Sequence, residues 1–272
     1  MTTWAERVRA ALAADVVEHR HNHTGVGKLS FAVARGSDRL WARVASDSDE
    51  DAALRRWAAH ADRLALYAAP PVLDVLTIDG RATLVLPLLH EVSRPVPADE
   101  VLAVLRRLHA DTELAAALGP PVTSREAFTR VWLRRLRADL AIVRGHVPDE
   151  VFGWMEAEVT ALARLIDGPD FDEVVHAPVH GDPWHENVLA TADRWWLIDW
   201  EDLAVGDPVI DEAIAAPGTG ATVRHRVAHR AVMLDAAVDT AADWVENTDP
   251  AIRDQKHRAH LRAVDDFRAL WP

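Results

Sequence analysis

The sequence predicts an α+β fold that joins a small, strand-rich N-terminal part to a larger helical C-terminal part. In the first part, short apolar runs alternate with turn signals, and Asp79-Gly80 is the dipeptide most typical of a tight β-hairpin. In the second part, apolar residues recur at helical spacing over long segments. We therefore expect an N-terminal domain at 1–90, a proline-containing hinge at 91–97 and a helical domain at 98–272.

The N-terminal part should contain hairpin-forming strands and two helices. Thr3 and Glu6 form a capping-box pattern that begins the first helix, which we expect to extend to about Val17. Apolar periodicity and turn residues predict the remaining elements, which are strands at 29–34, 40–45, 72–78 and 82–88 and a helix at 48–67. Strands joined by such tight turns form an antiparallel sheet.

The C-terminal part should be mainly helical. Pro148 and Gly168 bound one of its helices, because proline favours the first turn of a helix and glycine the position after the last. The predicted elements are helices at 98–111, 124–144, 148–168, 221–246 and 250–269 and short strands at 174–179 and 195–199.

The composition excludes several classes of protein. The 272 residues include no cysteine, which rules out disulfide scaffolds, thiol catalysis and cysteine-ligated metals. A formal charge of -13 repels nucleic-acid phosphate and anionic membranes, so we expect neither as a partner. The same charge would attract cationic small molecules. Only Lys28 and Lys256 are lysines, which argues against Schiff-base chemistry.

The ends and apolar runs of the chain give no targeting signal. The N-terminal residues lack a basic segment followed by an apolar one, and no uncharged run approaches the ~18 residues that a membrane helix needs. We therefore expect no signal peptide and a cytoplasmic protein.

The chemistry is concentrated between residues 172 and 212, where eleven Asp and Glu residues accompany one basic residue, Arg194. Asp182 and Asp199 each follow a short apolar run, and Asn187 lies between them. Two carboxylates and an amide are hard oxygen ligands that suit Mg²⁺, which usually also binds substrate phosphates. The alternative is a solvated acidic face, but acids interleaved with Trp, Ile, Leu and Val at strand spacing are costly without a purpose.

Two motifs in this segment resemble a known family. His180-Gly-Asp182-Pro-Trp-His-Glu-Asn187 matches H-G-D-x-x-x-x-N, and Ile198-Asp-Trp-Glu201 matches the I-D-x-[DE] that follows it. This pair resembles the aminoglycoside phosphotransferase and choline kinase family, whose fold is the two-lobed fold of protein kinases. Leu105-Arg-Arg-Leu-His109 and Gly206-Asp-Pro-x-x-Asp211 resemble further motifs of that family, and the similarity covers roughly residues 20–215.

The resemblance implies a role for each motif residue. Asp182 would be the catalytic aspartate, which orients the substrate hydroxyl toward the γ-phosphate of a nucleotide and accepts its proton. Asn187 and Asp199 would hold Mg²⁺. Asp207 would fasten the loop backbone, whereas Glu201 could support the site indirectly or contact the metal. The expected cofactor is Mg²⁺, with ATP or GTP as co-substrate.

The N-terminal part resembles the family less closely. The family places a cation on its third strand to hold the α- and β-phosphates, and Arg43 is the match here. Its expected carboxylate partner is Glu50, with Asp51 as the alternative, and Arg43 could also be a surface strand residue. Gly25 and Gly27 would let the backbone approach phosphate closely, and Leu88 lies in the segment expected to contact the base.

Other interpretations of these motifs fit less well. A P-loop ending at Lys28 would need glycine at position 22 and Ser or Thr at position 29, but the sequence has Asn22 and Leu29. A zinc hydrolase site could be formed by His176, His180, Asp182 and His185. This interpretation leaves the second motif unexplained. His19, His21 and His23 could hold a metal, although a solvated loop is the simpler interpretation. A protein kinase is disfavoured because H-R-D, D-F-G and A-P-E motifs are missing.

The acceptor should bind to the helical part. Asp235, Asp239 and Asp243 fall on one face of a predicted helix, where they could bind ammonium groups or form a solvent-facing stripe. Trp184 and His185 lie within the catalytic loop and are the residues most expected to touch the acceptor. Tryptophans could instead surround a quaternary ammonium group, as in choline.

Together these features predict a Mg²⁺-dependent phosphotransferase that moves the γ-phosphate of a nucleoside triphosphate to a hydroxyl of a small, cationic molecule. An aminoglycoside or related antibiotic is the first candidate acceptor, which would make the protein a resistance enzyme. The alternatives are a metabolic kinase for choline, an amino alcohol or a sugar, and a non-catalytic binding protein with the same fold.

Overall fold

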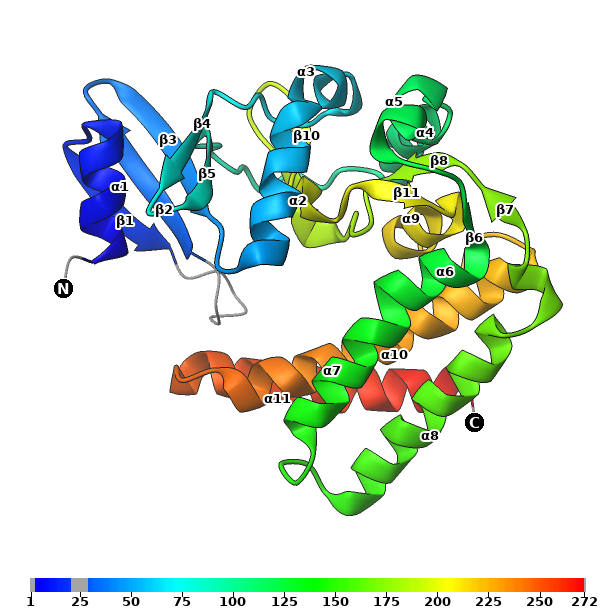
Figure 1. Ribbon diagram of the computed structural model, residues 1–272. Coiled ribbons are helices and arrows are strands. Elements are labelled where there is room, and N and C mark those ends of the chain that lie inside the picture. The colour runs from blue at the N-terminus through cyan, green and yellow to red at the C-terminus, as the bar shows by residue number, and fades with distance from the viewer. Residues whose placement is uncertain (1–2, 21–28, 272) are drawn as a thin grey trace. The chain divides into compact units, whose positions relative to one another are not determined.

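The computed structural model describes residues 3–20 and 29–271, and the chain forms two compact units (Figure 1). The first unit contains residues 1–108 and 182–203, and the second contains 109–181 and 204–272. The segment that carries Asp182, Asn187 and Asp199 therefore belongs to the strand-rich unit. The expected domain boundaries and the hinge at 91–97 stay predictions.

A five-stranded antiparallel sheet dominates the first unit, with strand order β1-β2-β3-β5-β4. Its strands are β1 (Val16–Arg20), β2 (Leu29–Arg35), β3 (Asp38–Val44), β4 (Asp74–Ile78) and β5 (Arg81–Pro87). The predicted hairpin turns at Asp79 and Gly80, with φ angles of 49° and 81°. Two successive positive φ angles are typical of a type I′ turn, whose twist matches that of the flanking strands.

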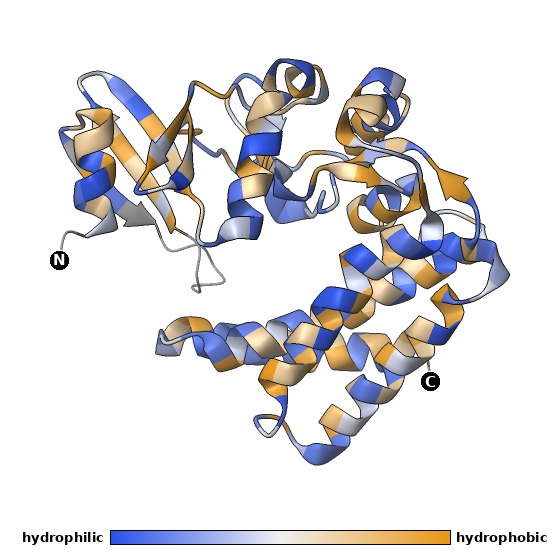
Figure 2. Ribbon diagram, in the orientation of Figure 1, coloured by the Kyte–Doolittle hydropathy of each residue, from blue (hydrophilic) through white to orange (hydrophobic). Residues whose placement is uncertain are grey.

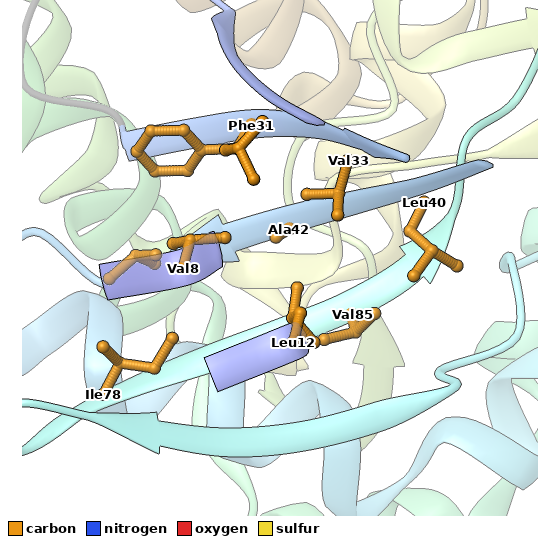
Figure 3. Packing of buried hydrophobic residues seen from close by; sticks show 10 residues of the cluster. Val8, Leu12, Phe31, Val33, Leu40, Ala42, Ile78 and Val85 are labelled. Carbon is orange, nitrogen blue, oxygen red and sulfur yellow. The ribbon is translucent and has the colours of Figure 1, made fainter. Parts of the chain in front are cut away.

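Helix α1 (Trp4–Leu12) packs its apolar face on this sheet (Figure 3). Val8 and Leu12 from α1 join buried residues from four strands, which are Phe31, Val33, Leu40, Ala42, Ile78 and Val85. Burying a side chain of this size contributes roughly 1.5–3 kcal/mol. The cluster therefore anchors the sheet from which Arg43 projects.

The capping box that begins α1 is confirmed, since Thr3 and Glu6 each accept from the other's backbone N–H. The prediction that this helix extends to Val17 is wrong. It ends at Leu12, Ala13 adopts a left-handed conformation, and β1 begins at Val16. Residues 16–20 instead pair with β2, because the ladder provides partners for their backbone groups.

The helix predicted at 48–67 is interrupted at His60, where the backbone leaves helical geometry. It consists of α2 (Ser48–Ala59), α3 (Ala61–Leu64) and a single 3₁₀ turn at Ala65–Tyr67. Asp47 caps α2 by accepting hydrogen bonds from the N–H groups of Asp49 and Glu50. This cap places Glu50 in the first turn, on the side of α2 that reaches Arg43.

The rest of the first unit is built from α4 and the segment that contains both motifs. Its elements are α4 (Ala98–His109), a 3₁₀ turn at His185–Asn187, β9 (Val188–Ala190), β10 (Trp195–Leu197) and a 3₁₀ turn at Trp200–Asp202. Strands β9 and β10 form an antiparallel hairpin. Backbone hydrogen bonds from Leu197 to Ala68 and from Val92 to Ala190 join this hairpin to the rest of the unit.

The second unit is mainly helical, and α10 is its central helix. Helix α10 packs against α7, α8, α9 and α11. The helices are α5 (Thr112–Leu118), α6 (Ser124–Phe128), α7 (Arg134–Val143), α8 (Asp149–Ile166), α9 (Pro208–Ala215), α10 (Val223–Glu246) and α11 (Pro250–Leu270). Figure 2 shows hydrophobic and hydrophilic residues alternating along α7 and α8, as expected for helices with one buried face.

Shorter elements complete the second unit. The single helix predicted at 124–144 contains a π-helical segment at Thr129–Leu133 between α6 and α7. The short elements are a 3₁₀ turn at Pro169–Phe171 and the strands β6 (Val122–Thr123), β7 (Val174–Val175), β8 (Ala177–Val179) and β11 (Ala204–Gly206). Strand β11 pairs with β8, and a Cβ at Gly206 would lie 2.7 Å from a methyl group of Val179. Across residues 3–20 and 29–271, no helix combines the length and apolar character needed to cross a membrane.

Candidate active site

Asp182 and Asn187 are in direct contact in the first unit. The Asn187 Nδ2 donates hydrogen bonds to the Asp182 backbone oxygen at 2.9 Å and to the Asp182 carboxylate Oδ2 at 3.0 Å. Both partners are acceptors, so the amide NH₂ must face Asp182. This orientation leaves the amide oxygen of Asn187 as the group that can bind a cation.

The β9–β10 hairpin brings Asp199 close to Asn187. Ile198 donates its N–H to the Asn187 backbone oxygen at 2.9 Å, so Asp199 follows directly after a residue bonded to Asn187. Asp199 adopts a left-handed backbone with φ 63° and ψ 59°. Such a conformation costs on the order of 1 kcal/mol outside glycine and is concentrated at functional sites.

Arg43 lies on β3 and is the buried cation of the same unit, with 8% of its surface exposed. Its Nε donates to Glu50 at 2.6 Å, and its Nη2 donates to Glu201 Oε2 at 2.8 Å. Burial opposes the charge of Arg43, but the carboxylates of Glu201, Asp199 and Glu50 outweigh this effect and raise its pKa above the usual value.

The two carboxylates that bind Arg43 are held differently. Glu50 also accepts hydrogen bonds from the backbone N–H and the hydroxyl of Ser46, at 2.6 and 2.5 Å. Glu201 belongs to the 3₁₀ turn after Asp199, where Arg56 from α2 donates to its backbone oxygen at 3.2 Å. The structure thus places Arg43 beside Glu50, and it adds Glu201 as a second partner.

In the second unit, Asp211 holds the start of the catalytic loop. Its Oδ2 and Oδ1 accept hydrogen bonds from the backbone N–H groups of His180 and Gly181, each at 2.8 Å. The His109 Nε2 lies 2.9 Å from the same Oδ2. Asp211 is fully buried, and the residue that follows Gly181 along the chain is Asp182.

The expectation that Asp207 fastens the loop is corrected by this arrangement. Asp207 caps α9 by accepting from the N–H of Val209, and its Oδ2 lies 3.0 Å from Arg224 Nη1. The loop N–H groups reach Asp211 instead, because one turn of α9 lies between the two aspartates. Both acids belong to one sequence motif, but only the fold decides which acid the loop contacts.

The remaining predicted site residues occupy several places. Leu88 follows β5, and its N–H donates to the Arg39 carbonyl at 2.9 Å, so a base would have to bind other backbone groups nearby. Trp184 and His185 lie side by side in the catalytic loop with ring centroids 5.0 Å apart. Gly25 and Gly27, with His21 and His23, lie outside the described residues. The side chain of His19 is likewise not described.

Asp235 and Asp239 lie on α10 in the second unit, within a crowded acidic cluster. We define this α7–α10 cluster as Asp139, Asp235, Asp239 and Asp243. Asp235 pairs with Arg135, and Asp243 lies 2.6 Å from Lys256. Asp139 was not among the residues predicted from the sequence, because periodicity within α10 does not indicate which residue of α7 packs against it.

Burial and mutual repulsion raise the pKa values of this cluster. Burial, followed by Asp239 and Asp235, raises the pKa of Asp139 to about 7, and Arg135 only partly opposes this effect. Burial and Asp239 raise the pKa of Asp243 to about 6 despite Lys256. Burial is also the main cause of the raised pKa of Asp235.

The donor set of the first unit fits a hard divalent cation. The amide oxygen of Asn187 and the carboxylate of Asp199 are oxygen ligands of the type that Mg²⁺ prefers. Among residues 3–20 and 29–271, no three His, Asp or Glu side chains gather as a metal-binding group. Magnesium sites that bind nucleotides usually include substrate phosphates and water.

Comparisons with known proteins identify a family model that matches the chain and solved structures with a similar fold. The model of the phosphotransferase enzyme family matches residues 21–271. A thermostable mutant of the aminoglycoside phosphotransferase APH(4)-Ia, solved with ADP and hygromycin B, has a TM-score of 0.61 at 18% identity, over 100% of both chains. A type I macrolide 2′-phosphotransferase has a TM-score of 0.54 at 19% identity, over 94% of this chain and 96% of that one.

A third solved structure is the spectinomycin phosphotransferase APH(9)-Ia in complex with ADP and spectinomycin. Its TM-score is 0.56 at 11% identity, over 100% of this chain and 96% of that one. Comparison with curated proteins finds no match. The likeness to the solved structures shows the kinase-like α+β fold, and the family model, which matches most of the sequence, shows that the chain belongs to the phosphotransferase enzyme family.

Proposed function

We propose that this protein transfers the γ-phosphate of a nucleoside triphosphate to a hydroxyl of a small, cationic molecule. The observation that supports the proposal is the contact between Asp182 and Asn187, together with the backbone hydrogen bond from Ile198, the residue before Asp199, to Asn187. Family membership supports phosphotransfer to a small molecule, and the solved relatives with ADP support a nucleotide as the donor.

Asp182 would orient the acceptor and accept its proton. The acceptor hydroxyl oxygen forms a bond to the γ-phosphorus while the bond from that phosphorus to the β–γ bridging oxygen breaks, which releases the nucleoside diphosphate. The hydroxyl proton passes to the Asp182 carboxylate and then to solvent. Asn187 would hold that carboxylate in place through its 3.0 Å hydrogen bond.

Asn187 and Asp199 would hold Mg²⁺, and a bound ion would neutralise charge on the β- and γ-phosphates. The need for a cation follows from the local charge. The buried Arg43 supplies one positive charge against four carboxylates, which are those of Asp182, Asp199, Glu50 and Glu201. These carboxylates would repel a polyanionic nucleotide. Arg43 would bind the α- and β-phosphates, with Gly25 and Gly27 covering them and Leu88 next to the base.

The acceptor would be cationic, and an aminoglycoside or related antibiotic is the first candidate. The support is the α7–α10 cluster, where Asp239 and Asp235 add negative charge to a region already crowded with carboxylates. Trp184 and His185 would contact the acceptor from the catalytic loop. Cytoplasmic location and a role in antibiotic resistance belong to the same proposal.

The experiment measures nucleoside diphosphate release with Mg-ATP or Mg-GTP against a panel of aminoglycosides, other cationic antibiotics, choline-type amines and sugars. Stimulation by one compound identifies the acceptor, and a choline-type amine or sugar as the only active compound would establish a metabolic kinase instead. Loss of a positioned general base typically costs 10²–10⁴-fold in rate. Asp182→Asn should therefore lose at least ~100-fold in activity while still binding nucleotide.

The control is Glu186→Gln, which removes an exposed carboxylate from the same loop. This variant should keep the activity of the unmodified protein. Full activity of Asp182→Asn would overturn the proposed role of Asp182. Nucleotide binding without turnover on any compound of the panel would favour a non-catalytic binding protein.

A further inference from the structure

Helix α2 contacts the candidate site at two separate places. Glu50, in its first turn, binds Arg43, the cation that would hold phosphate. Arg56, in its last turn, donates through Nη2 to the backbone oxygen of Glu201 at 3.2 Å. Glu201 lies two residues after Asp199, which would hold Mg²⁺. One helix therefore supports both the strand that carries the phosphate cation and the turn that follows the proposed metal ligand.

The guanidinium of Arg56 is in a costly position. Its side chain is half-buried, and its Nε is buried with no hydrogen-bond partner in the part of the chain that the structure describes. Among the described residues Arg56 forms no ion pair, so its charge faces a neutral carbonyl group. Burying a charge without an opposite charge lowers stability, whereas an apolar side chain here would not. Stability therefore does not explain this arginine, and its role lies in the turn that it holds.

We infer that Arg56 is a positioning residue for the proposed metal site. By holding the Glu201 carbonyl from α2, it fixes the turn after Asp199 and keeps the Asp199 carboxylate where it can bind a divalent cation. This inference rests on the proposed function, because that cation belongs to the same reaction. It adds to the site a residue that lies outside both family motifs.

The backbone at Asp199 is the part of the site that needs support. Its left-handed conformation is unfavourable outside glycine and persists where surrounding contacts hold it. Before Asp199, the N–H groups of Leu197 and Ile198 donate to other segments of the same unit, each at 2.9 Å. After it, Arg56 ties the 3₁₀ turn Trp200–Asp202 to α2, which also packs against this turn. Arg56 therefore supports Asp199 on its C-terminal side.

The charge of Arg56 and its hydrogen bond should have opposite effects on a bound cation. Its positive charge repels Mg²⁺, so removing the charge alone should tighten metal binding. Losing the hydrogen bond should weaken metal binding, because the turn is then less restrained. A hydrogen bond from a charged donor changes an equilibrium constant by about tenfold or more, whereas solvent and salt screen the repulsion. The sign of the effect therefore distinguishes positioning from charge.

The test measures the dissociation constants of Mg-ATP, and of ATP in the presence of EDTA, by calorimetry or equilibrium dialysis. The ratio of the two constants reports how much the metal adds to nucleotide affinity. Arg56→Met should bind Mg-ATP about tenfold more weakly than the unmodified protein. Its affinity for ATP in EDTA should stay within about twofold, because Arg43 and Glu50 are unchanged. Damage to α2 as a whole would instead weaken both constants, since α2 also supports Arg43 through Glu50.

Two further variants serve as controls. Arg56→Lys keeps the charge and a donor on a different side chain, so its affinity for Mg-ATP should lie between those of Arg56→Met and the unmodified protein. Arg55→Met removes the same charge from the next residue of α2, whose side chain is exposed and pairs with Asp51. It should change either constant by less than about twofold. Thermal melting shows whether each variant is folded.

Unchanged or tighter binding of Mg-ATP by folded Arg56→Met would overturn the inference. Equal weakening with Mg²⁺ and with EDTA, or an equal loss in Arg55→Met, would also overturn it. If Arg56→Met does not fold, Arg56→Lys provides the test, because its loss of affinity should still be larger with Mg²⁺ than with EDTA. If the unmodified protein binds no nucleotide, or gains no affinity from Mg²⁺, the proposed function itself fails, and this result does not depend on Arg56.

Discussion

Two kinds of carboxylate site occur in this protein: one is rich in hydrogen-bond donors, and the other is crowded with further carboxylates. In the first unit, Arg43 binds Glu50 and Glu201 directly, and in the second unit Asp211 accepts two backbone N–H groups with His109 beside it. In the part of the chain that the structure describes, the ion pairs of the four carboxylates in the α7–α10 cluster are Asp235 with Arg135 and Asp243 with Lys256. One oxygen of Asp139 is buried without a hydrogen-bond partner.

The difference shows that the hydrogen-bond donors around a buried carboxyl group decide whether its negative charge stabilises the fold. Both carboxylate oxygens of Asp211 accept a backbone N–H, and the His109 Nε2 lies beside one of them, so each oxygen has a geometric role in the fold. Burial, and then the neighbouring carboxylates, raise the pKa of Asp139 to about 7 and so favour its neutral form. Removing the charge should therefore destabilise the protein at the first position and stabilise it at the second.

The largest expected effect is at Asp211. Asp211→Asn replaces one carboxylate oxygen with an NH₂ group that faces other donors, and breaking such a buried network costs about 3–5 kcal/mol. We expect urea unfolding to show a loss of stability of about this size. We also expect the activity to fall, because the catalytic loop becomes less ordered. Glu212→Gln, next along α9, should cost much less, because its carboxylate pairs with His225 at a more exposed position. Equal losses for the two variants would contradict the comparison.

The second prediction concerns Asp139, where removing the charge should raise stability by an amount that depends on pH. The folded-state pKa of Asp139 is about 7, above its ordinary value of 3.8, so the folded protein binds the proton more tightly than the unfolded chain does. Its contribution to stability is therefore complete below pH ~4 and is lost as the pH rises to about 7. Asp139→Asn should raise the free energy of unfolding at pH 8 by about 2 kcal/mol after allowance for solvent screening.

The measurement for Asp139→Asn is thermal melting at pH 4.5 and at pH 8. The difference between the variant and the unmodified protein should be small at the lower pH and large at the higher one. A variant that is less stable at pH 8 would show that the ionised Asp139 has donors that the described contacts do not include.

A smaller effect is expected where a cation is removed from the cluster. Lys256→Met leaves Asp243 beside Asp239 without its 2.6 Å partner. Loss of Lys256 raises the folded pKa of Asp243 above its present value of about 6, so the cost appears as the pH rises through that range. We expect a loss of about 1 kcal/mol at pH 8 and less at pH 5. Asp243→Asn in the same chain should remove most of this pH dependence.

The smallest effect is expected at an exposed ion pair, which gives the reference for both regions. Arg55 and Asp51 lie one turn apart on α2, with Nε and Oδ2 2.8 Å apart. Pairs of this kind contribute little to stability, and salt screens them. Arg55→Ala should lower stability only slightly in low salt and by still less in 0.5 M salt. A loss of stability as large as that of Asp211→Asn would mean that burial does not explain the difference between these carboxylates.

Local features of the fold were predictable because they depend on neighbours along the chain. The capping box of Thr3 and Glu6, the hairpin at Asp79 and Gly80 and the helices of the C-terminal part follow from short-range hydrogen bonds and periodicity. The end of the first helix and the interruption at His60 were not predicted. At those points, strand pairing and packing outweigh the helical tendency of the sequence.

The sequence by itself determined the family motifs and the short-range site, because Asp182, Asn187 and Asp199 are joined by one loop and one hairpin. Only the tertiary structure decided which distant groups control the charges around them. Glu201 reaches Arg43 across 158 residues, Asp211 rather than Asp207 binds the loop, and Asp139 faces α10 from α7. The physical reason is that the energy of a buried charge depends on the donors and charges within a few ångströms, and folding rather than spacing along the chain chooses those neighbours.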